Sequence, residues 1–136
     1  PVATTITIQD TAAKIVIDLN DEWNKFNDKK LVMGCIIARS EFVEANPQAV
    51  EAFLKDYEAS IKAVSEDVDG VAAACEEFGI IPKAPIAKKA IPYCNIVFEA
   101  GEEMKSDLSA YLTFLHTANP KSVGGKLPAD DFYYGK

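Results

Sequence analysis

The stretch that most constrains the fold of this chain covers residues 31–64. It begins with an apolar run, residues 31–38, that contains no charged side chain and is bounded by polar residues. Such a run predicts a buried β-strand, and its apolar character on both faces is typical of a central strand covered on both sides. Asn46 and Pro47 then predict the N-cap and the first position of an α-helix. We therefore expect a strand followed by a long helix, the core of an α/β body.

The rest of the chain predicts further strands and helices. Residues 1–8 and 14–19 are rich in β-branched side chains, which favours two additional extended segments or strands. Apolar residues recur at three- and four-residue spacings, with capping or stop residues at the ends, in four segments, which predicts helices over residues 46–65, 68–78, 85–91 and 101–117. Two or three strands are too few for a closed sheet. The fold class is therefore α/β, mostly helical, and the chain resembles part of a larger α/β domain.

Single features add detail to this outline. Trp23 lies in a predicted brief helical turn, and we expect its side chain to pack against the rest of the protein rather than to stack on a ligand. Asp67 or Asp69 is expected to begin the helix over residues 68–78, and Gly79 to end it. Gly70 weakens this prediction, because glycine inside a helix costs about 1 kcal/mol relative to alanine.

Composition excludes several classes of partner. The chain has 136 residues, 49 % hydrophobic side chains and a formal net charge of −7. This is the size of one domain with enough apolar side chains for a core. Nucleic acids and anionic membranes select basic surfaces, so we expect no nucleic-acid partner. No stretch approaches the roughly 20 apolar residues of a membrane span.

Side chains suited to catalysis or metal binding are few and scattered. His116 is the single histidine and is predicted near a helix C-terminus, where the helix dipole favours a charged imidazole. Cys35, Cys75 and Cys94 form no C-x-x-C pair and are expected to be small buried side chains. We therefore assign no catalytic residue, no metal site and no cofactor, and expect that the chain is not an enzyme.

Several phrases of the sequence, taken in order, resemble a known family. The segment after residue 38 has the pattern F-x-x-x-N-P-x-x-V-x-x-F-L, formed by Phe42, Asn46, Pro47, Val50, Phe53 and Leu54. The later phrases FGIIPKAPIAKKAIPYCNIVF and ANPKSVGGKLPADDFYYG, and PVATT at the start, add to the set. Together they resemble the substrate-binding proteins of ABC transporters of the NMT1/THI5-like family, the sulfonate, nitrate and thiamin-precursor type.

The resemblance implies a fold and a binding site. The chain would be a C-terminal fragment of a two-lobed periplasmic-binding-protein (type II) fold, and its start at Pro1 rather than Met agrees with an excised piece. Residues 1–30 would be a remnant of the second lobe with the cleft loop, and residues 31–136 the returning hinge strand with the C-terminal helices of the first lobe. The ligand-binding residues implied are Pro1, Val2, Ala3, Thr4 and Thr5. Read without the resemblance, the threonines of this segment are ordinary strand residues.

The resemblance also implies a function. The chain would be the solute-binding component of an ABC importer, which captures a small molecule between two lobes and delivers it to the ABC permease. Its location would be extracytoplasmic, in the periplasm or as a lipid-anchored lipoprotein. Exposed apolar surface on a fragment predicts self-association. Two alternatives are a helical interaction or regulatory module without a small-molecule role, and an enzyme that makes the thiamin pyrimidine precursor.

Overall fold

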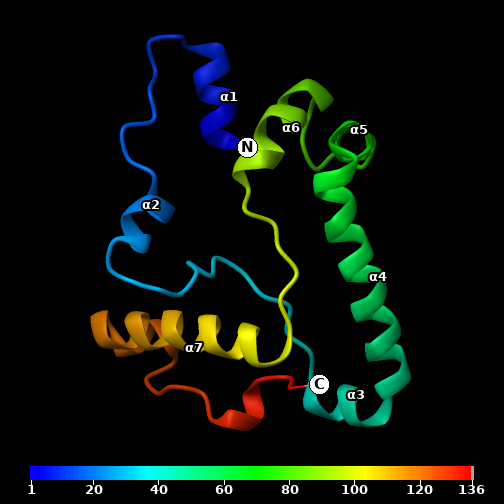
Figure 1. Cartoon of the computed structure of the whole chain (residues 1–136), viewed down its shortest axis with the longest axis vertical. Helices are drawn as coiled ribbons and strands as arrows, with labels where there is room; N and C mark the ends of the chain where they lie inside the picture. The colour runs from blue at the N-terminus through cyan, green and yellow to red at the C-terminus, as the bar shows by residue number, and fades with distance from the viewer. Residues whose placement is uncertain (136) are drawn as a thin grey trace. The chain divides into compact units, whose positions relative to one another are not determined.

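The structure, a computed structural model, describes residues 1–135, in which all regular elements are helices (Figure 1). The α-helices are α1 (Val2–Gln9), α2 (Leu19–Asn24), α3 (Ser40–Ala45), α4 (Pro47–Glu66), α5 (Val68–Glu77), α6 (Ala84–Ala90) and α7 (Gly101–Ala118). The 3₁₀ helices are η1 (Ile91–Tyr93), η2 (Pro120–Val123) and η3 (Asp130–Phe132). The mostly helical character expected from the sequence is therefore confirmed.

The chain divides into two compact units. Unit 1 consists of Pro1–Ile15 and Ala38–Phe98, and unit 2 consists of Val16–Ile37 together with the residues from Glu99 onward. Unit 1 thus contains α1 and α3 to α6, whereas unit 2 contains α2 and α7. None of the described helices combines the length and the apolar character that a membrane crossing requires.

The strand predictions are wrong for the described residues. Residues 1–8 lie almost entirely in α1, where the Thr5 hydroxyl donates to the Pro1 carbonyl at 3.0 Å and the Thr7 hydroxyl to the Ala3 carbonyl at 3.1 Å. Bonds of this kind, to the carbonyl four residues earlier, let threonine fit a helix despite its β-branched side chain. Residues 14–18 and 31–39 have no regular structure. A strand needs a neighbour for its N–H and C=O groups, and nothing in residues 1–135 forms a sheet.

The helix predictions from residue 46 onward are confirmed. Pro47 is the first residue of helix α4, as predicted from the Asn–Pro pair. Helix α5 begins after Asp67, whose carboxylate accepts a hydrogen bond from the Gly70 amide at 2.9 Å, and Gly79 follows its end with φ of +67°. Helix α3 was not predicted, because its six residues form too short a pattern to show helical periodicity.

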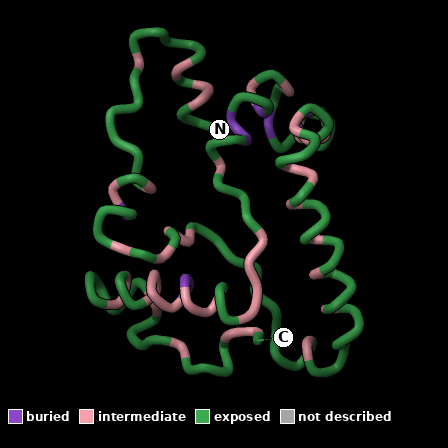
Figure 2. The backbone as a smooth tube through the Cα atoms, viewed as in Figure 1, coloured by how far each residue is buried: buried purple, intermediate pink, exposed green. Residues whose placement is uncertain are grey.

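The core of unit 1 lies between α5, α6 and η1. Its buried residues are Ala72, Ile81, Ala87 and Ile91, and Figure 2 shows buried backbone around α6. Two of the four are alanines, which lets the backbones of α5 and α6 approach closely. Partly buried apolar side chains from the end of α4, from α5 and from α6 surround this cluster: Val64, Val68, Val71, Cys75, Ala84 and Ile86.

The core of unit 2 centres on Trp23, the only tryptophan of the chain. Trp23 is 8 % exposed and packs edge-to-face on Tyr111 and Phe114 of α7, with ring centroids 5.7 and 5.0 Å away. Its indole N–H donates to the Lys29 carbonyl at 2.6 Å. The predicted packing role of Trp23 is therefore confirmed.

Candidate functional site

The residues assigned to ligand binding by resemblance lie at the start of α1. Pro1 is the N-cap residue, and Val2, Ala3, Thr4 and Thr5 form the first turn of the helix. Val2 is 74 % exposed, and the Thr5 hydroxyl is already bonded to the Pro1 carbonyl. These five residues are neighbours along the helix rather than a convergent pocket. Their role in binding stays a prediction.

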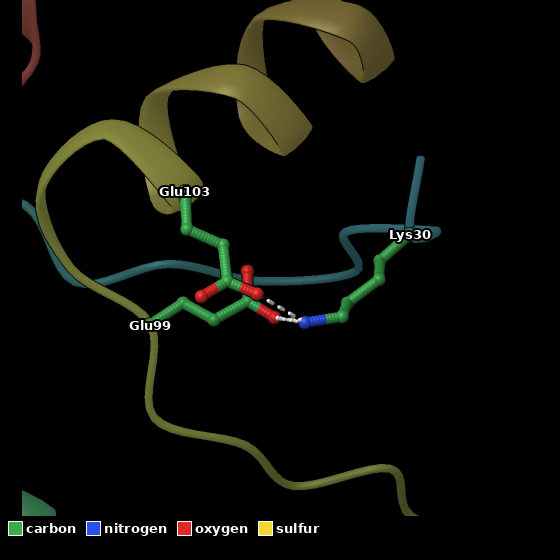
Figure 3. A network of polar contacts seen from close by, with 3 residues as sticks. All are labelled: Lys30, Glu99 and Glu103. Atoms are coloured by element: carbon green, nitrogen blue, oxygen red, sulfur yellow. Dashed lines mark hydrogen bonds and ion pairs between the residues drawn. The ribbon is translucent and has the colours of Figure 1, made fainter. Parts of the chain in front are cut away.

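A three-residue ionic cluster in unit 2 joins Lys30 to the start of α7 (Figure 3). The Lys30 ammonium lies 2.5 Å from Glu99 Oε1 and 2.9 Å from Glu103 Oε1. The two carboxylates, Glu99 first and then Glu103, hold the pKa of Lys30 above the usual lysine value of 10.5. The ion pairs therefore link the segment before residue 31 to the start of α7 within unit 2.

Sequence reasoning missed this cluster. Lys30 and its two partners are 69 and 73 residues apart in the sequence, so no local spacing marks them. The only signal was the charge of each residue, and 26 % of the residues in the chain are charged.

The histidine and the cysteines form no catalytic constellation. His116 is in the last turn of α7, the position predicted for it. Cys75 and Cys94 are partly buried, but Cys35 is exposed, so the prediction of a buried side chain is wrong for Cys35. The reason is that residues 31–39 have no sheet to cover them. Within residues 1–135, no three His, Cys, Asp or Glu side chains are placed to hold a metal ion.

A hollow lies between α5 and α6. It measures about 210 Å³ and is lined by Asp69, Ala72, Ala84, Pro85 and Lys88. The Lys88 ammonium lies 2.5 Å from Asp69 Oδ1, so the two charged residues of its wall neutralise each other. The volume is below the roughly 300–1,000 Å³ of typical ligand sites.

A larger hollow lies at the corner where α3 meets α4. It measures about 390 Å³ and is open to solvent, because its lining residues, Ala45, Asn46, Pro47, Gln48 and Ala49, are consecutive in the sequence and all exposed. The Asn46 amide donates to the Phe42 carbonyl at 3.0 Å, and its side chain does not cap α4. The positive end of the α4 dipole is therefore left without a side-chain cap at this hollow.

An aromatic cluster lies further along α4. Phe53 and Tyr57 stack with ring centroids 5.6 Å apart and planes 10° from parallel, and Phe98 meets Tyr57 edge-on at 6.0 Å. We call these three rings the aromatic face of α4. Phe53 and Tyr57 have the four-residue spacing of one helix face, yet no residue of α4 is buried. The corner hollow and the aromatic face are the candidate ligand-binding features of unit 1.

Comparison with known proteins identifies the family. The family model VitK2_biosynth, described as menaquinone biosynthesis, matches residues 4–117. The chain belongs to this family. No curated protein and no solved structure matches the chain.

The family match corrects the resemblance drawn from the sequence. The chain belongs to a biosynthetic enzyme family rather than to the substrate-binding proteins of ABC transporters. The expectations of a solute receptor that delivers to an ABC permease, of a transport role and of a chain that is not an enzyme are therefore wrong. The physical reason is that the Asn46–Pro47 phrase encodes a helix start followed by an amphipathic helix, and many unrelated proteins require that pattern.

Proposed function

We propose that this protein acts as an enzyme on a small molecule in menaquinone biosynthesis. The observation that carries the proposal is the family match over residues 4–117, which includes residues from both compact units. The corner hollow, the aromatic face of α4 and the ionic cluster of Lys30 all lie within the matched residues. They are the places in the chain where a ligand or a positioning role has structural support.

A deletion strain tests this function directly. We expect cells that lack the gene to lose menaquinone, measured by mass spectrometry of extracted lipids, and to regain it when the full-length gene is returned. The extract of the deletion strain should accumulate a compound that the purified full-length protein converts. Total phospholipid serves as the control, because a general defect in lipid synthesis would lower it too. Normal menaquinone content in the deletion strain would contradict the proposal.

We also propose that the helices belong to a larger two-lobed α/β protein, whose further segments would pair with residues 31–38 as a strand; within residues 1–135 this segment has no strand partner. The support is the exposure of an uncharged apolar segment: Met33 is 79 %, Ile36 55 % and Ile37 78 % exposed. Covering apolar surface gains about 25 cal/mol per Å², so a sheet around this segment would be stabilising. Hydrogen exchange of the full-length protein is the test. Slow exchange of the amides of residues 31–38 is expected, and exchange at the rate of an unstructured chain would rule the strand out.

Two expectations from the sequence remain predictions. The extracytoplasmic location was implied by the transporter resemblance, and the ligand role of Pro1 to Thr5 had the same origin. Cell fractionation with an antibody to the protein checks the location. Replacing Thr4 and Thr5 together with valine, which keeps the side-chain shape, checks the role of their hydroxyl groups.

A further inference from the structure

We propose that Asp107 of α7 anchors a binding site for a small organic cation, a guanidinium or ammonium group with N–H donors. Asp107 is 6 % exposed and is the one charged side chain that is buried within residues 1–135. Its carboxylate forms no hydrogen bond or ion pair with another residue of this range, and neither of its oxygens is sealed from solvent. The site lies in unit 2, and it does not depend on the proposed function.

The charged neighbours of Asp107 on α7 have partners, whereas Asp107 has none within residues 1–135. Glu103, four residues earlier, lies 2.9 Å from the Lys30 ammonium, and Lys105 lies 3.1 Å from Asp130. A buried carboxylate without a partner costs free energy, because it loses much of its hydration and gains no bond in return. A cation bound at Asp107 would supply the missing partner.

The charge around Asp107 favours a cation over a neutral donor. The Lys30 ammonium is shared by Glu99 and Glu103, so three carboxylates at this end of α7 have one ammonium between them. An excess of one sign of charge around a recessed group raises the local concentration of the opposite ion. Lys30 itself is already bonded to two acceptors, so a further cation must come from elsewhere.

Aromatic side chains continue from Asp107 along the same face of α7. Tyr111 and Phe114 follow it at four and seven residues, and both pack on Trp23 of α2. Phe114 is 51 % exposed, so part of its ring is open to a ligand. Ring faces attract organic cations, and a guanidinium gives up its hydration more readily than a compact ion. A carboxylate beside such rings therefore suits an organic cation.

Methylguanidinium is the first probe, because it is small enough to reach a carboxylate of which little is exposed. N-methylurea has nearly the same shape and no charge, so it is the matched control. Trp23 is the only tryptophan, and its indole N–H gives a single NMR signal next to Tyr111. We expect methylguanidinium to shift this signal and the amide signal of Asp107, with a dissociation constant on the order of 10 mM. Equal shifts with N-methylurea, or none with either, would overturn the inference.

Paired variants give the second test. Asp107→Asn keeps the size of the side chain but removes its charge, and should weaken methylguanidinium binding at least about tenfold, because bonds between two charged groups are the strong ones. Glu102→Gln makes the same chemical change at an exposed position of the same helix, and should change binding less than about twofold. Wild-type binding by Asp107→Asn, or equal weakening in both variants, would refute the site.

Stability separates a binding role from a purely structural one. If Asp107 had a partner in the folded protein, its replacement by asparagine would lower the urea midpoint. A site that waits for a cation predicts the opposite: without ligand, the midpoint of Asp107→Asn should equal or exceed that of the wild type. A lower midpoint would assign Asp107 to the fold and contradict the proposal.

The same cation chemistry is available from a free small molecule and from an arginine side chain of another protein. Butylguanidinium represents the first source, and N-acetylarginine N-methylamide, which adds a peptide backbone to the same group, represents the second. The small exposed fraction of Asp107 leaves little room beside it, so butylguanidinium should bind at least as tightly. Clearly tighter binding of the arginine derivative would contradict a small-molecule ligand.

Discussion

Replacing Trp23 with alanine should be among the most destabilising single changes in unit 2. Trp23 is 8 % exposed, contacts two aromatic rings of α7 and donates its indole N–H to the Lys29 carbonyl. Truncation of a buried tryptophan to alanine costs about 3–5 kcal/mol. Within that total, each edge-to-face ring pair contributes about 0.5–1.5 kcal/mol and the hydrogen bond a similar amount. A domain is typically stable by about 5–15 kcal/mol, so about a fifth or more of its stability would be lost.

A conservative variant separates the ring from the hydrogen bond. Trp23→Phe keeps an aromatic ring against α7 but leaves the Lys29 carbonyl without its donor, so we expect a loss of about 1–2 kcal/mol. Phe26→Ala is the matched control, because Phe26 lies three residues further on and is 83 % exposed. Its effect should stay within about 0.5 kcal/mol.

Urea denaturation followed by far-ultraviolet circular dichroism measures these differences. With an m value of about 2 kcal/mol per M, a loss of about 4 kcal/mol lowers the midpoint by about 2 M. The wild-type protein provides a second signal, since its only tryptophan should emit at shorter wavelength when folded than when unfolded. Equal midpoints for Trp23→Ala and Phe26→Ala would show that Trp23 does not organise unit 2.

Three further predictions concern the α5 cap and the ionic cluster. Asp67→Ala should lower stability by about 1 kcal/mol in urea denaturation, because it removes the side-chain acceptor of the Gly70 amide. A Cβ on Gly70 would collide with the Asp67 carboxylate. Gly70→Ala should therefore be nearly neutral in the wild type, but should stabilise the protein by about 0.5–1 kcal/mol in the Asp67→Ala background. Additive effects of the two changes on the free energy of unfolding would refute the collision. The pKa of Lys30, measured by NMR, should lie above 10.5, and it should move back toward that value in the Glu99→Gln variant. Because the folded-state pKa of Lys30 is raised, its ion pairs contribute fully below pH 10.5, and the contribution is lost only as the pH rises through the folded-state pKa. A measured Lys30 pKa below 10.5 would show that the carboxylates are not in contact with the ammonium.

Much of the helical structure could be predicted because its signals are local. Pro47 begins α4, Asp67 caps α5, and Gly79 with positive φ follows the end of α5. Each of these depends on the geometry of one helical turn, which neighbouring residues specify by themselves. The apolar spacing along α4 and α7 is local in the same sense.

The strands and the site could not be predicted by the same reasoning. A β-strand is stable only beside another strand, so the apolar run of residues 31–38 carries no information about whether a partner is present. Lys30 meets Glu99 and Glu103 only after the chain folds back across about 70 residues. The family could not be read from the phrase around Asn46 and Pro47, because helix-start chemistry is common to many families.

The sequence by itself determined where the main helices lie, the net charge of −7 and the packing role of Trp23. The tertiary structure decided which helix faces meet: the alanines of α5 and α6 in unit 1, and Trp23 on α7 in unit 2. It also decided that Phe53 is exposed and Tyr57 only partly buried, although their spacing is that of one apolar helix face. The physical reason is that periodicity specifies an apolar face, whereas only the arrangement of distant segments specifies what covers that face.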